Sequence, residues 1–282
     1  MRGIVSDSTF AGANHYGCWL VCFSNGGSQE EGLTNSKPKT KNQVLQETMF
    51  FSFKKSYKDS GYLEGFTDWH SHILPDVDDG IKTMQEAIDV LDYYESLGIK
   101  EVWLTPHVME DIPNGSSCLR QRFEELCSSY SGKVKLHLAA EYMLDNLFLE
   151  RLRDGDLLTY GNSGKQILVE TSYVQAPYGF HNILQEIKDA DLTPVLAHPE
   201  RYQYMNWNDY QSLIAKGIVF QLNILSLVGA YGSMAQDKAF ELLEEGYYTY
   251  HGTDVHSLTS VMRLMEKKSL KKSDIALLRN PY

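Results

Sequence analysis

From residue 66 onward, short apolar stretches alternate with segments of helical period. In these segments apolar residues recur at three- and four-residue intervals, for example at Met84, Ala87, Ile88 and Leu91, which predicts helices. Regular alternation of strands and helices favours a parallel sheet with right-handed crossovers. We therefore expect an α/β fold, a barrel close to the (β/α)8 type but with seven strands. The predicted strands are residues 66–70, 102–107, 135–142, 167–171, 194–198, 218–223 and 247–256.

Charge and cysteine content restrict the environment and the partners. The net charge of −11 argues against nucleic acid or an anionic membrane surface as the main partner. No apolar run approaches the length of a membrane span, so we expect no direct membrane insertion. None of Cys18, Cys22, Cys118 and Cys127 forms a Cys-x-x-Cys pair, which favours a reducing, cytoplasmic compartment. No cysteine precedes an arginine by six positions, so the loop of thiol-based phosphatases is absent.

The first part of the chain differs from the rest in composition. Residues 24–32 and 35–41 are polar and rich in Gly, Ser and Lys, without helical or strand periodicity, which predicts disorder. Met49 then begins a stretch that resembles a natural start. We expect residues 1–48 to be a disordered N-terminal extension and residues 49–282 to form the barrel domain.

Two histidines end the first predicted strand. Residues i and i+2 on a strand point to the same face, so His70 and His72 can bind the same metal ion. Asp79 follows in the next loop, and Gly80 allows that loop to turn tightly. A His-x-His pair alone is more often two strand histidines beside a solvated acidic loop, so the assignment depends on the rest of the chain.

Further imidazoles and carboxylates end other predicted strands. In a parallel barrel these ends meet on one face, where barrel enzymes carry their sites. Imidazole and carboxylate without thiolate suit Zn, Mn or Fe. Together with the first group they are too many for one ion, so we expect two or three ions, a centre suited to in-line displacement at phosphorus. The additional positions are His107, Glu141, Glu170, His198, Asp254 and His256.

The motifs that contain these residues resemble the PHP (polymerase and histidinol phosphatase) family. They are His-x-His, Thr-Pro-His, a strand-ending Glu, Ala-His-Pro-Glu-Arg-Tyr at 197–202 and Asp-x-His. The fuller pattern His-Ser-His-Ile-Leu-Pro-x-Val-Asp-Asp-Gly at 70–80 is similar to the metal-dependent protein-tyrosine phosphatases of bacterial capsule and exopolysaccharide loci. The resemblance covers residues 66–282.

This resemblance implies a distorted TIM-like (β/α)7 barrel of the PHP type with three metal ions. Manganese is the expected cofactor, with iron or zinc as alternatives. The implied ligands of the first ion are His70, His72, Glu141 and Asp254. Those of the second are Glu141 as a bridge, Glu170 and His198, and those of the third are Asp79, His107 and His256.

The resemblance also implies catalytic roles for His198, His256 and Arg201. Arg201 matches the arginine that contacts phosphate, and a planar guanidinium suits two hydrogen bonds to a phosphoryl group. The alternative for Arg201 is a surface ion pair with Glu200. The family often has a second arginine where this chain has Val261, and the nearest arginine is Arg263.

Three functions remain open at this point. The first is a phosphatase that acts on the tyrosine-phosphorylated tail of a bacterial tyrosine kinase and so regulates capsular polysaccharide synthesis. The second is a small-molecule phosphomonoesterase of histidinol-phosphatase type, which would need a carboxylate for the substrate amine. The third is a non-catalytic metal-binding docking module, which a missing ligand would favour. The sequence does not give the oligomeric state.

Overall fold

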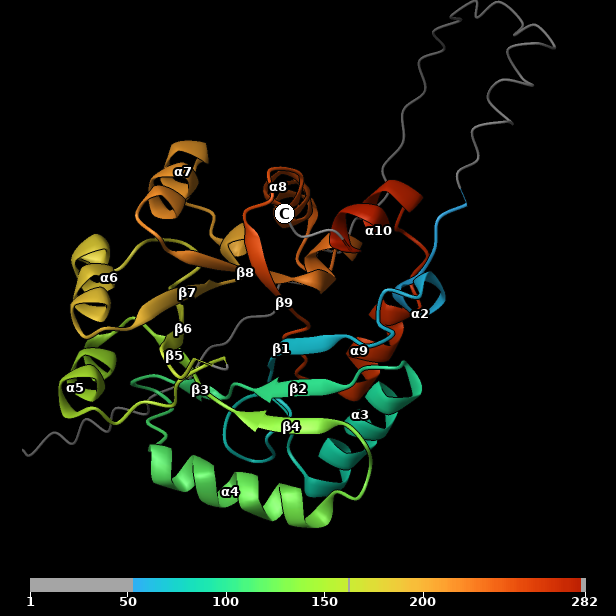
Figure 1. Ribbon diagram of the computed structural model, residues 1–282, viewed down its shortest axis with the longest axis horizontal. Coiled ribbons are helices and arrows are strands. Elements are labelled where there is room, and N and C mark those ends of the chain that lie inside the picture. The colour runs from blue at the N-terminus through green and yellow to red at the C-terminus, as the bar shows by residue number, and fades with distance from the viewer. Residues whose placement is uncertain (1–52, 162, 280–282) are drawn as a thin grey trace, which may run out of the picture. The chain divides into compact units, whose positions relative to one another are not determined.

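The computed structural model describes residues 53–161 and 163–279 (Figure 1). The expected extension, residues 1–48, lies outside the described residues, which belong to one compact unit. The strands are β1 (Thr67–Ser71), β2 (Glu101–Leu104), β3 (His107–Val108), β4 (Lys135–Leu138), β5 (Glu141–Met143), β6 (Gln166–Glu170), β7 (Thr193–Ala197), β8 (Val219–Asn223) and β9 (Tyr248–Gly252). The helices are α2 (Tyr57–Ser60), α3 (Met84–Ser96), α4 (Ser116–Ser129), α5 (Asn146–Asp154), α6 (Phe180–Asp189), η1 (Pro199–Arg201), α7 (Trp207–Ala215), η2 (Ile224–Val228), α8 (Ser233–Glu244), α9 (Leu258–Met265) and α10 (Lys272–Arg279).

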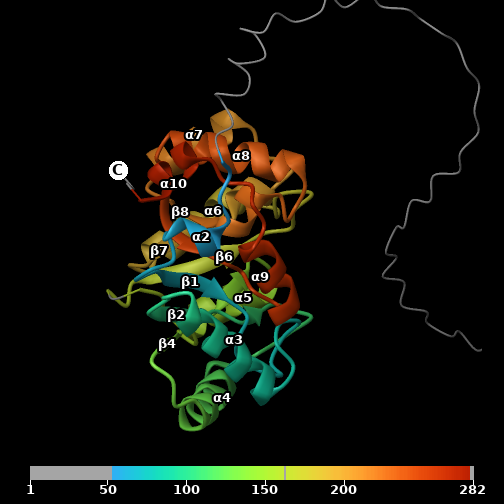
Figure 2. The same ribbon diagram turned by 90° about the vertical axis from the view of Figure 1, so that its right-hand side faces the viewer.

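Every strand pair in the two described sheets is parallel, as the alternation predicts. The described strands do not form one closed sheet, so the expected distorted TIM-like (β/α)7 barrel is not confirmed. One sheet has the order β1-β2-β4 and the other has the order β3-β5-β6-β7-β8-β9. Figures 1 and 2 show the strands in the middle, with α4 and α8 on opposite sides of them.

Two predicted strands are each divided into two, and this separates the sheets. Residues 102–107 become β2 and β3 because Thr105-Pro106 interrupts them, and proline cannot donate to a sheet ladder. Residues 135–142 become β4 and β5, separated at Ala139-Ala140. Backbone bonds continue across both breaks, since Ala139 N donates to Leu104 O at 2.9 Å and Glu141 N to Pro106 O at 3.0 Å.

A short seam joins the first and last strands. Asp254 N donates to His70 O at 2.8 Å, and His72 N donates to Val255 O at 3.0 Å. Gly252 makes this approach feasible, because a Cβ atom there would lie 2.5 Å from the Cβ of His70. The seam brings the two ends of the strand series together at residues that the sequence assigns to the site.

The helices follow the predicted periodicity and their caps are visible. The Thr83 hydroxyl accepts from Glu86 N at 3.1 Å at the start of α3, as its capping-box pattern predicts. The Asp145 carboxylate caps α5 in the same way, accepting from Phe148 N at 3.0 Å. Two helices, α9, whose Val261 and Met265 are buried, and α10, were not predicted from the sequence. No described helix has the length and apolarity that a membrane span requires.

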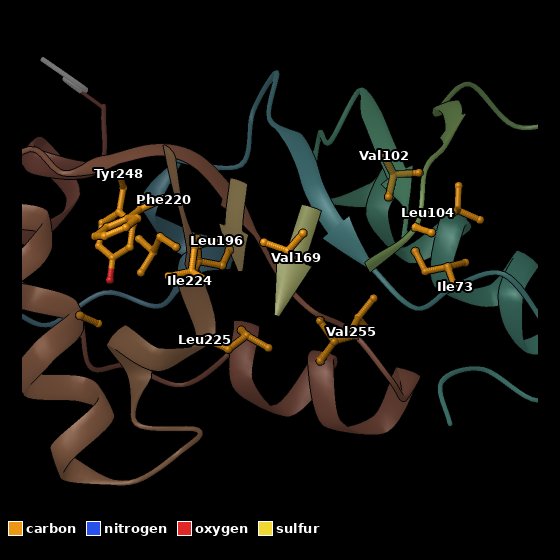
Figure 3. Packing of buried hydrophobic residues seen from close by; sticks show 14 of the residues in the cluster. Ile73, Val102, Leu104, Val169, Leu196, Phe220, Ile224, Leu225, Tyr248 and Val255 are labelled. Atoms are coloured by element: carbon orange, nitrogen blue, oxygen red, sulfur yellow. The ribbon is translucent and has the colours of Figure 1, made fainter. Parts of the chain in front are cut away.

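One large apolar cluster fills the space between strands and helices. It extends from the β1–β2 side of the molecule to β8 and α8, so both sheets share it. Figure 3 shows its labelled members, which are Ile73, Val102, Leu104, Val169, Leu196, Phe220, Ile224, Leu225, Tyr248 and Val255. Burial of this kind is the main favourable contribution to folding.

A buried histidine within the fold gives a test that does not involve the site. Burial lowers the pKa of His251 to about 4, and its Nδ1 lies 2.6 Å from the Tyr62 hydroxyl, within hydrogen-bond distance. Below pH ~6.5 the unfolded chain binds a proton here that the folded chain does not, so the free energy of unfolding falls as the pH drops toward 4. This loss is at most about 3 kcal/mol. Urea titrations between pH 4.5 and 7 should show a shallower decline in His251→Gln, and identical profiles would contradict this assignment.

Candidate metal centre

All the ligand positions predicted from the sequence lie in one cluster. His70 and Glu170 lie in the C-terminal parts of β1 and β6, and His107 and Glu141 begin the short strands β3 and β5. The others follow β1, β7 and β9 closely, except Asp79, which lies in the loop between β1 and α3. The parallel order of the strands therefore places these side chains on the same face, as the sequence predicts. Three compact groups share members, and they are His70-His72-Glu141-Asp254, His107-Glu141-Glu170 and His72-Asp79-His107-His256.

The first group is completely buried. The Nε2 atoms of His70 and His72 lie 3.1 Å apart, and Glu141 Oε2 is 3.2 Å from the first and 3.3 Å from the second. Asp254 Oδ1 lies 3.2 Å from His72 Nε2. Four ligand atoms thus converge on one point, in the combination that the family resemblance implies for the first ion.

The other two groups differ from the implied sets. His107 Nδ1 lies 3.0 Å from Glu170 Oε1, whereas His198 Nε2 lies 3.0 Å from Glu141 Oε1 but 3.9 Å from Glu170 Oε2. His107 therefore joins the second group where His198 was expected, and His198 lies beside it. The third group gains His72. It is also the most open group, since the side chain of Asp79 is 66% exposed.

Hydrogen bonds orient three of the imidazoles. Nδ1 of His70 contacts Gln221 Oε1 at 2.8 Å, and Nδ1 of His72 contacts Asp78 Oδ2 at 2.8 Å. Nδ1 of His256 contacts the Asp254 carbonyl oxygen at 2.9 Å. A ring that donates from Nδ1 presents the lone pair of Nε2 to the cluster, the arrangement usual for histidine ligands of metals. Asp78 thus orients a ligand and belongs to none of the three ligand groups.

The residues present fit divalent cations. Four polar atoms of the cluster are buried without a hydrogen-bond partner among the described residues. Buried polar atoms without a partner are rare unless an ion or a water molecule binds them. The donors are oxygen and imidazole nitrogen, which suit Mn, Fe or Zn. The orphaned atoms are His107 Nδ1, Glu141 Oε2, Glu170 Oε1 and His198 Nδ1.

The electrostatics also favour positive charge at this point. Burial alone would raise the pKa of Glu141, but neighbouring imidazoles hold it well below its usual range. Burial lowers the pKa of His70, whereas Glu141 and Asp254 raise it to a net value of about 9. Buried carboxylates thus require a cationic neighbour, whether imidazolium or metal ion.

Two site residues have backbone conformations that side chains rarely adopt. The φ angle is +33° at His198 and +53° at Asp254. His198 directly follows β7, and Asp254 lies two residues beyond the end of β9. Non-glycine residues with positive φ are strained, and such strain concentrates at functional sites.

Arg201 faces the same centre from η1. Its Nη1 donates to Asp254 Oδ2 at 2.7 Å. The alternative of a surface ion pair with Glu200 is wrong, because Glu200 is 1% exposed. The Glu200 carboxylate accepts instead from Ser226 Oγ at 2.8 Å and Tyr248 OH at 3.0 Å. Asp254 therefore faces the histidines with one oxygen and Arg201 with the other.

A cavity of about 470 Å³ opens onto the cluster. Two tyrosines, Tyr173 and Tyr231, line this cavity, whereas Tyr178 does not and Tyr202 is buried. Val261 and Arg263 both line it, so the side where the family often has an arginine is partly apolar. Its metal-cluster and cationic lining comprises Asp79, His107, Glu141, His198, Arg201, Asp254, His256 and Arg263.

Some functional neighbours were missed in the sequence. Gln221 orients His70, and Asn223 Nδ2 donates to Asp254 Oδ2 at 3.0 Å. Both are polar residues two positions apart at the end of an apolar strand, a signal that could have identified them. Tyr231 contacts Arg201, but its position in a loop gave no comparable signal.

Gly80 offers a test of how the cluster is supported. A Cβ atom there would lie 2.3 Å from the His72 carbonyl oxygen, so Gly80→Ala must displace His72 or the Asp79 loop. We expect at least about tenfold weaker manganese binding, the usual cost of disturbing ligand support. Metal content after dialysis against graded manganese measures this. At Gly115 a Cβ atom would be 3.9 Å from its nearest neighbour, so Gly115→Ala is the control, and equal loss in both variants would refute the prediction.

The chain is similar to proteins of bacterial capsule loci. The family model "Capsular polysaccharide synthesis, CpsB/CapC" matches residues 66–272. CapC of Staphylococcus aureus is 26% identical, with 68% of this chain and 78% of that protein covered. Tyrosine-protein phosphatase CpsB of Streptococcus agalactiae is 28% identical, with coverages of 68% and 83%.

A solved structure agrees with the fold. It is described as YwqE from Bacillus subtilis and CpsB from Streptococcus pneumoniae, "unique metal-dependent tyrosine phosphatases", and it matches with a TM-score of 0.63 and 22% identity. The match covers 77% of this chain and 92% of that one. The resemblance drawn from the sequence motifs is therefore confirmed, and the chain belongs to the CpsB/CapC family of capsular polysaccharide synthesis.

Proposed function

We propose that this chain is a metal-dependent protein-tyrosine phosphatase of capsule synthesis. The observation that carries the proposal is one cavity that combines the three ligand groups with Arg201. This chain covers most of the length of relatives that are named tyrosine-protein phosphatases. The combination suits hydrolysis of a phosphate monoester, in which negative charge must be neutralised at the phosphoryl oxygens.

The proposed ligands are the nine residues of the cluster, with three manganese ions and with iron or zinc as alternatives. Bound ions would supply Lewis acidity and lower the pKa of a water molecule. The protein residues hold the geometry. The buried first group is oriented by Gln221 and Asp78, whereas Asp79 and His256 of the third group border the cavity.

Arg201 is proposed to bind and orient the phosphoryl group. Its guanidinium lies at the cavity wall, and Asp254 accepts one of its hydrogen bonds, so other donors remain for an anion. The cavity wall on the α9 side includes Leu225, Ala230 and Val261, an apolar surface that suits the ring of a phosphotyrosine. A phenol leaves with a pKa of ~10 and needs less protonation than an aliphatic alcohol.

The proposed substrate is the tyrosine-phosphorylated tail of a bacterial tyrosine kinase, in the cytoplasm. Capsule synthesis is the process that the family description names. The cavity that we assign to phosphotyrosine is open to solvent along the Asp79 and His256 side, where these side chains are 66% and 32% exposed. A flexible segment of another protein can enter such a mouth without prior unfolding.

The two alternatives have less support. A phosphatase for an amino alcohol phosphate needs a carboxylate for the substrate amine. The cavity carboxylates Asp79, Glu141 and Asp254 all belong to the proposed ligand groups, which leaves none for an amine. A docking module would tolerate a missing ligand, whereas every ligand position here has a metal-binding side chain.

Activity with three substrates tests the proposal directly. We expect the full-length chain to release phosphate from a phosphotyrosine peptide with added manganese, and to stop when a chelator removes the ion. Hydrolysis of histidinol phosphate should be at least about 100-fold slower in kcat/KM, since a substrate-specific contact is missing. Phosphate release is measured with a colorimetric assay. Absence of manganese-stimulated release from the peptide would refute the phosphatase function.

Removal of the Arg201 guanidinium tests its role separately. Arg201→Ala should lower kcat/KM for the phosphopeptide by about 100-fold, the usual effect of losing one donor to a developing oxyanion. Metal content should remain close to native, because Arg201 is not among the proposed ligands. The exposed Arg153 on α5 supplies the matched control Arg153→Ala. Native activity in Arg201→Ala would show that the assigned role is wrong.

A further inference from the structure

The guanidinium of Arg201 lies between two tyrosine rings. Its Cζ atom is 4.3 Å from the ring centroid of Tyr173 and 4.0 Å from that of Tyr231. Tyr173 follows β6, and Tyr231 lies between η2 and α8, so separate segments supply the two rings. A cation over an aromatic face is attracted by the ring quadrupole, most strongly where water is excluded. Arg201 is 16% exposed, which meets this condition.

Two rings this close to the guanidinium restrict the directions in which it can donate. All five N–H donors lie in the plane of the group. Asp254 Oδ2 takes one donor at 2.7 Å. Because Arg201 also lines the large cavity, the remaining edge is the part that can donate to an anion there.

The rings are held by contacts that do not depend on Arg201. The Tyr231 hydroxyl accepts from Asn223 Nδ2 at 2.9 Å. The carbonyl oxygen of Tyr173 accepts from Gln203 N at 2.7 Å, and its ring stacks on Tyr202 with a centroid distance of 6.3 Å. The two rings therefore form a preformed slot for the guanidinium.

The slot also separates two cavities. Tyr173, Arg201 and Tyr231 line both the 470 Å³ cavity at the cluster and a second cavity of 210 Å³. Met234 and Lys238 lie on the far side of this wall, in the second cavity. A guanidinium without its rings could turn into that space and withdraw its donors from the cluster.

We propose that Tyr173 and Tyr231 are positioning residues that hold the guanidinium of Arg201 edge-on to the metal centre for phosphate binding. This inference rests on the proposed role of Arg201 as a phosphate ligand. The rings act through Arg201, so their contribution to anion binding disappears when Arg201 is absent. That dependence distinguishes positioning from a general effect of the tyrosines on the fold.

Equilibrium binding of inorganic phosphate to the manganese-loaded full-length chain tests the inference without requiring turnover. Tyr173→Leu and Tyr231→Leu should each weaken binding in isothermal titration by about tenfold, the effect of losing a desolvated cation–π contact. In the Arg201→Ala background, the same substitutions should change affinity by less than about twofold. Metal content is measured in every sample, so that ion loss is recognised.

Conservative and distant variants complete the experiment. Tyr231→Phe and Tyr173→Phe keep the ring and should bind within about threefold of native, since only a hydroxyl contact is lost. Tyr178→Leu changes a fully exposed tyrosine on the same loop as Tyr173 and should bind as native. If a Leu variant does not fold, the corresponding Met variant replaces it, because methionine fills irregular space.

Three outcomes overturn the inference. They are an equal loss from the Leu substitutions with and without Arg201, Phe variants as weak as Leu variants, and no phosphate binding by the native chain. A native chain that binds phosphate but hydrolyses neither peptide nor small substrates would refute the phosphatase proposal alone. The binding cycle would still decide the roles of the two tyrosines in that case.

Discussion

The short seam between β1 and β9 is the contact on which the centre depends. Two backbone hydrogen bonds, Asp254 N to His70 O and His72 N to Val255 O, join segments from opposite ends of the strand series. Asp68 stabilises the seam, because its carboxylate accepts hydrogen bonds from Thr253 N at 2.8 Å and from Tyr94 OH at 2.8 Å. Burial raises the pKa of Asp68 to about 6, so these hydrogen bonds offset part of a real desolvation cost. The first ligand group can form only where this seam has formed.

Asp254, which lies at the seam, contacts both the histidine ligands and Arg201. Its Oδ1 faces the imidazoles of His70 and His72, whereas its Oδ2 accepts from Arg201 and Asn223. The carboxylate is held from both sides in a backbone conformation with φ of +53°. A side chain fixed in this way sets the distance between the proposed ions and the proposed phosphate ligand. Any displacement of the seam would therefore affect ion binding and anion binding together.

The clustering of the ligand residues was predicted more accurately from the sequence than the arrangement of the strands in sheets. Strand-end positions such as His107 and Glu170 could be assigned to one face, because parallel strands impose that geometry regardless of how the sheet closes. The two-sheet arrangement could not be predicted, since it depends on where Pro106 and Ala139-Ala140 interrupt the ladders and on how their ends shift. The grouping of His107 with Glu141 and Glu170 depends on ångström-scale side-chain placement that spacing along the chain does not encode. The contact of Tyr231 with Arg201 was not predicted either, because residues in a loop have no periodicity that indicates where a side chain points.

The side chains of the metal cluster differ in solvent exposure. The first group is buried and reaches the cavity wall only through Glu141 and Asp254, whereas the third group meets the cavity through Asp79, His107 and His256 and is the most exposed. Ions bound in the buried first group would compensate its carboxylates, and their binding would be coupled to folding. An anion in the cavity can contact both the third group and Arg201, because both line it. His72 belongs to both the first and the third group and connects them, while Glu141 and His107 connect the second group to the first and to the third.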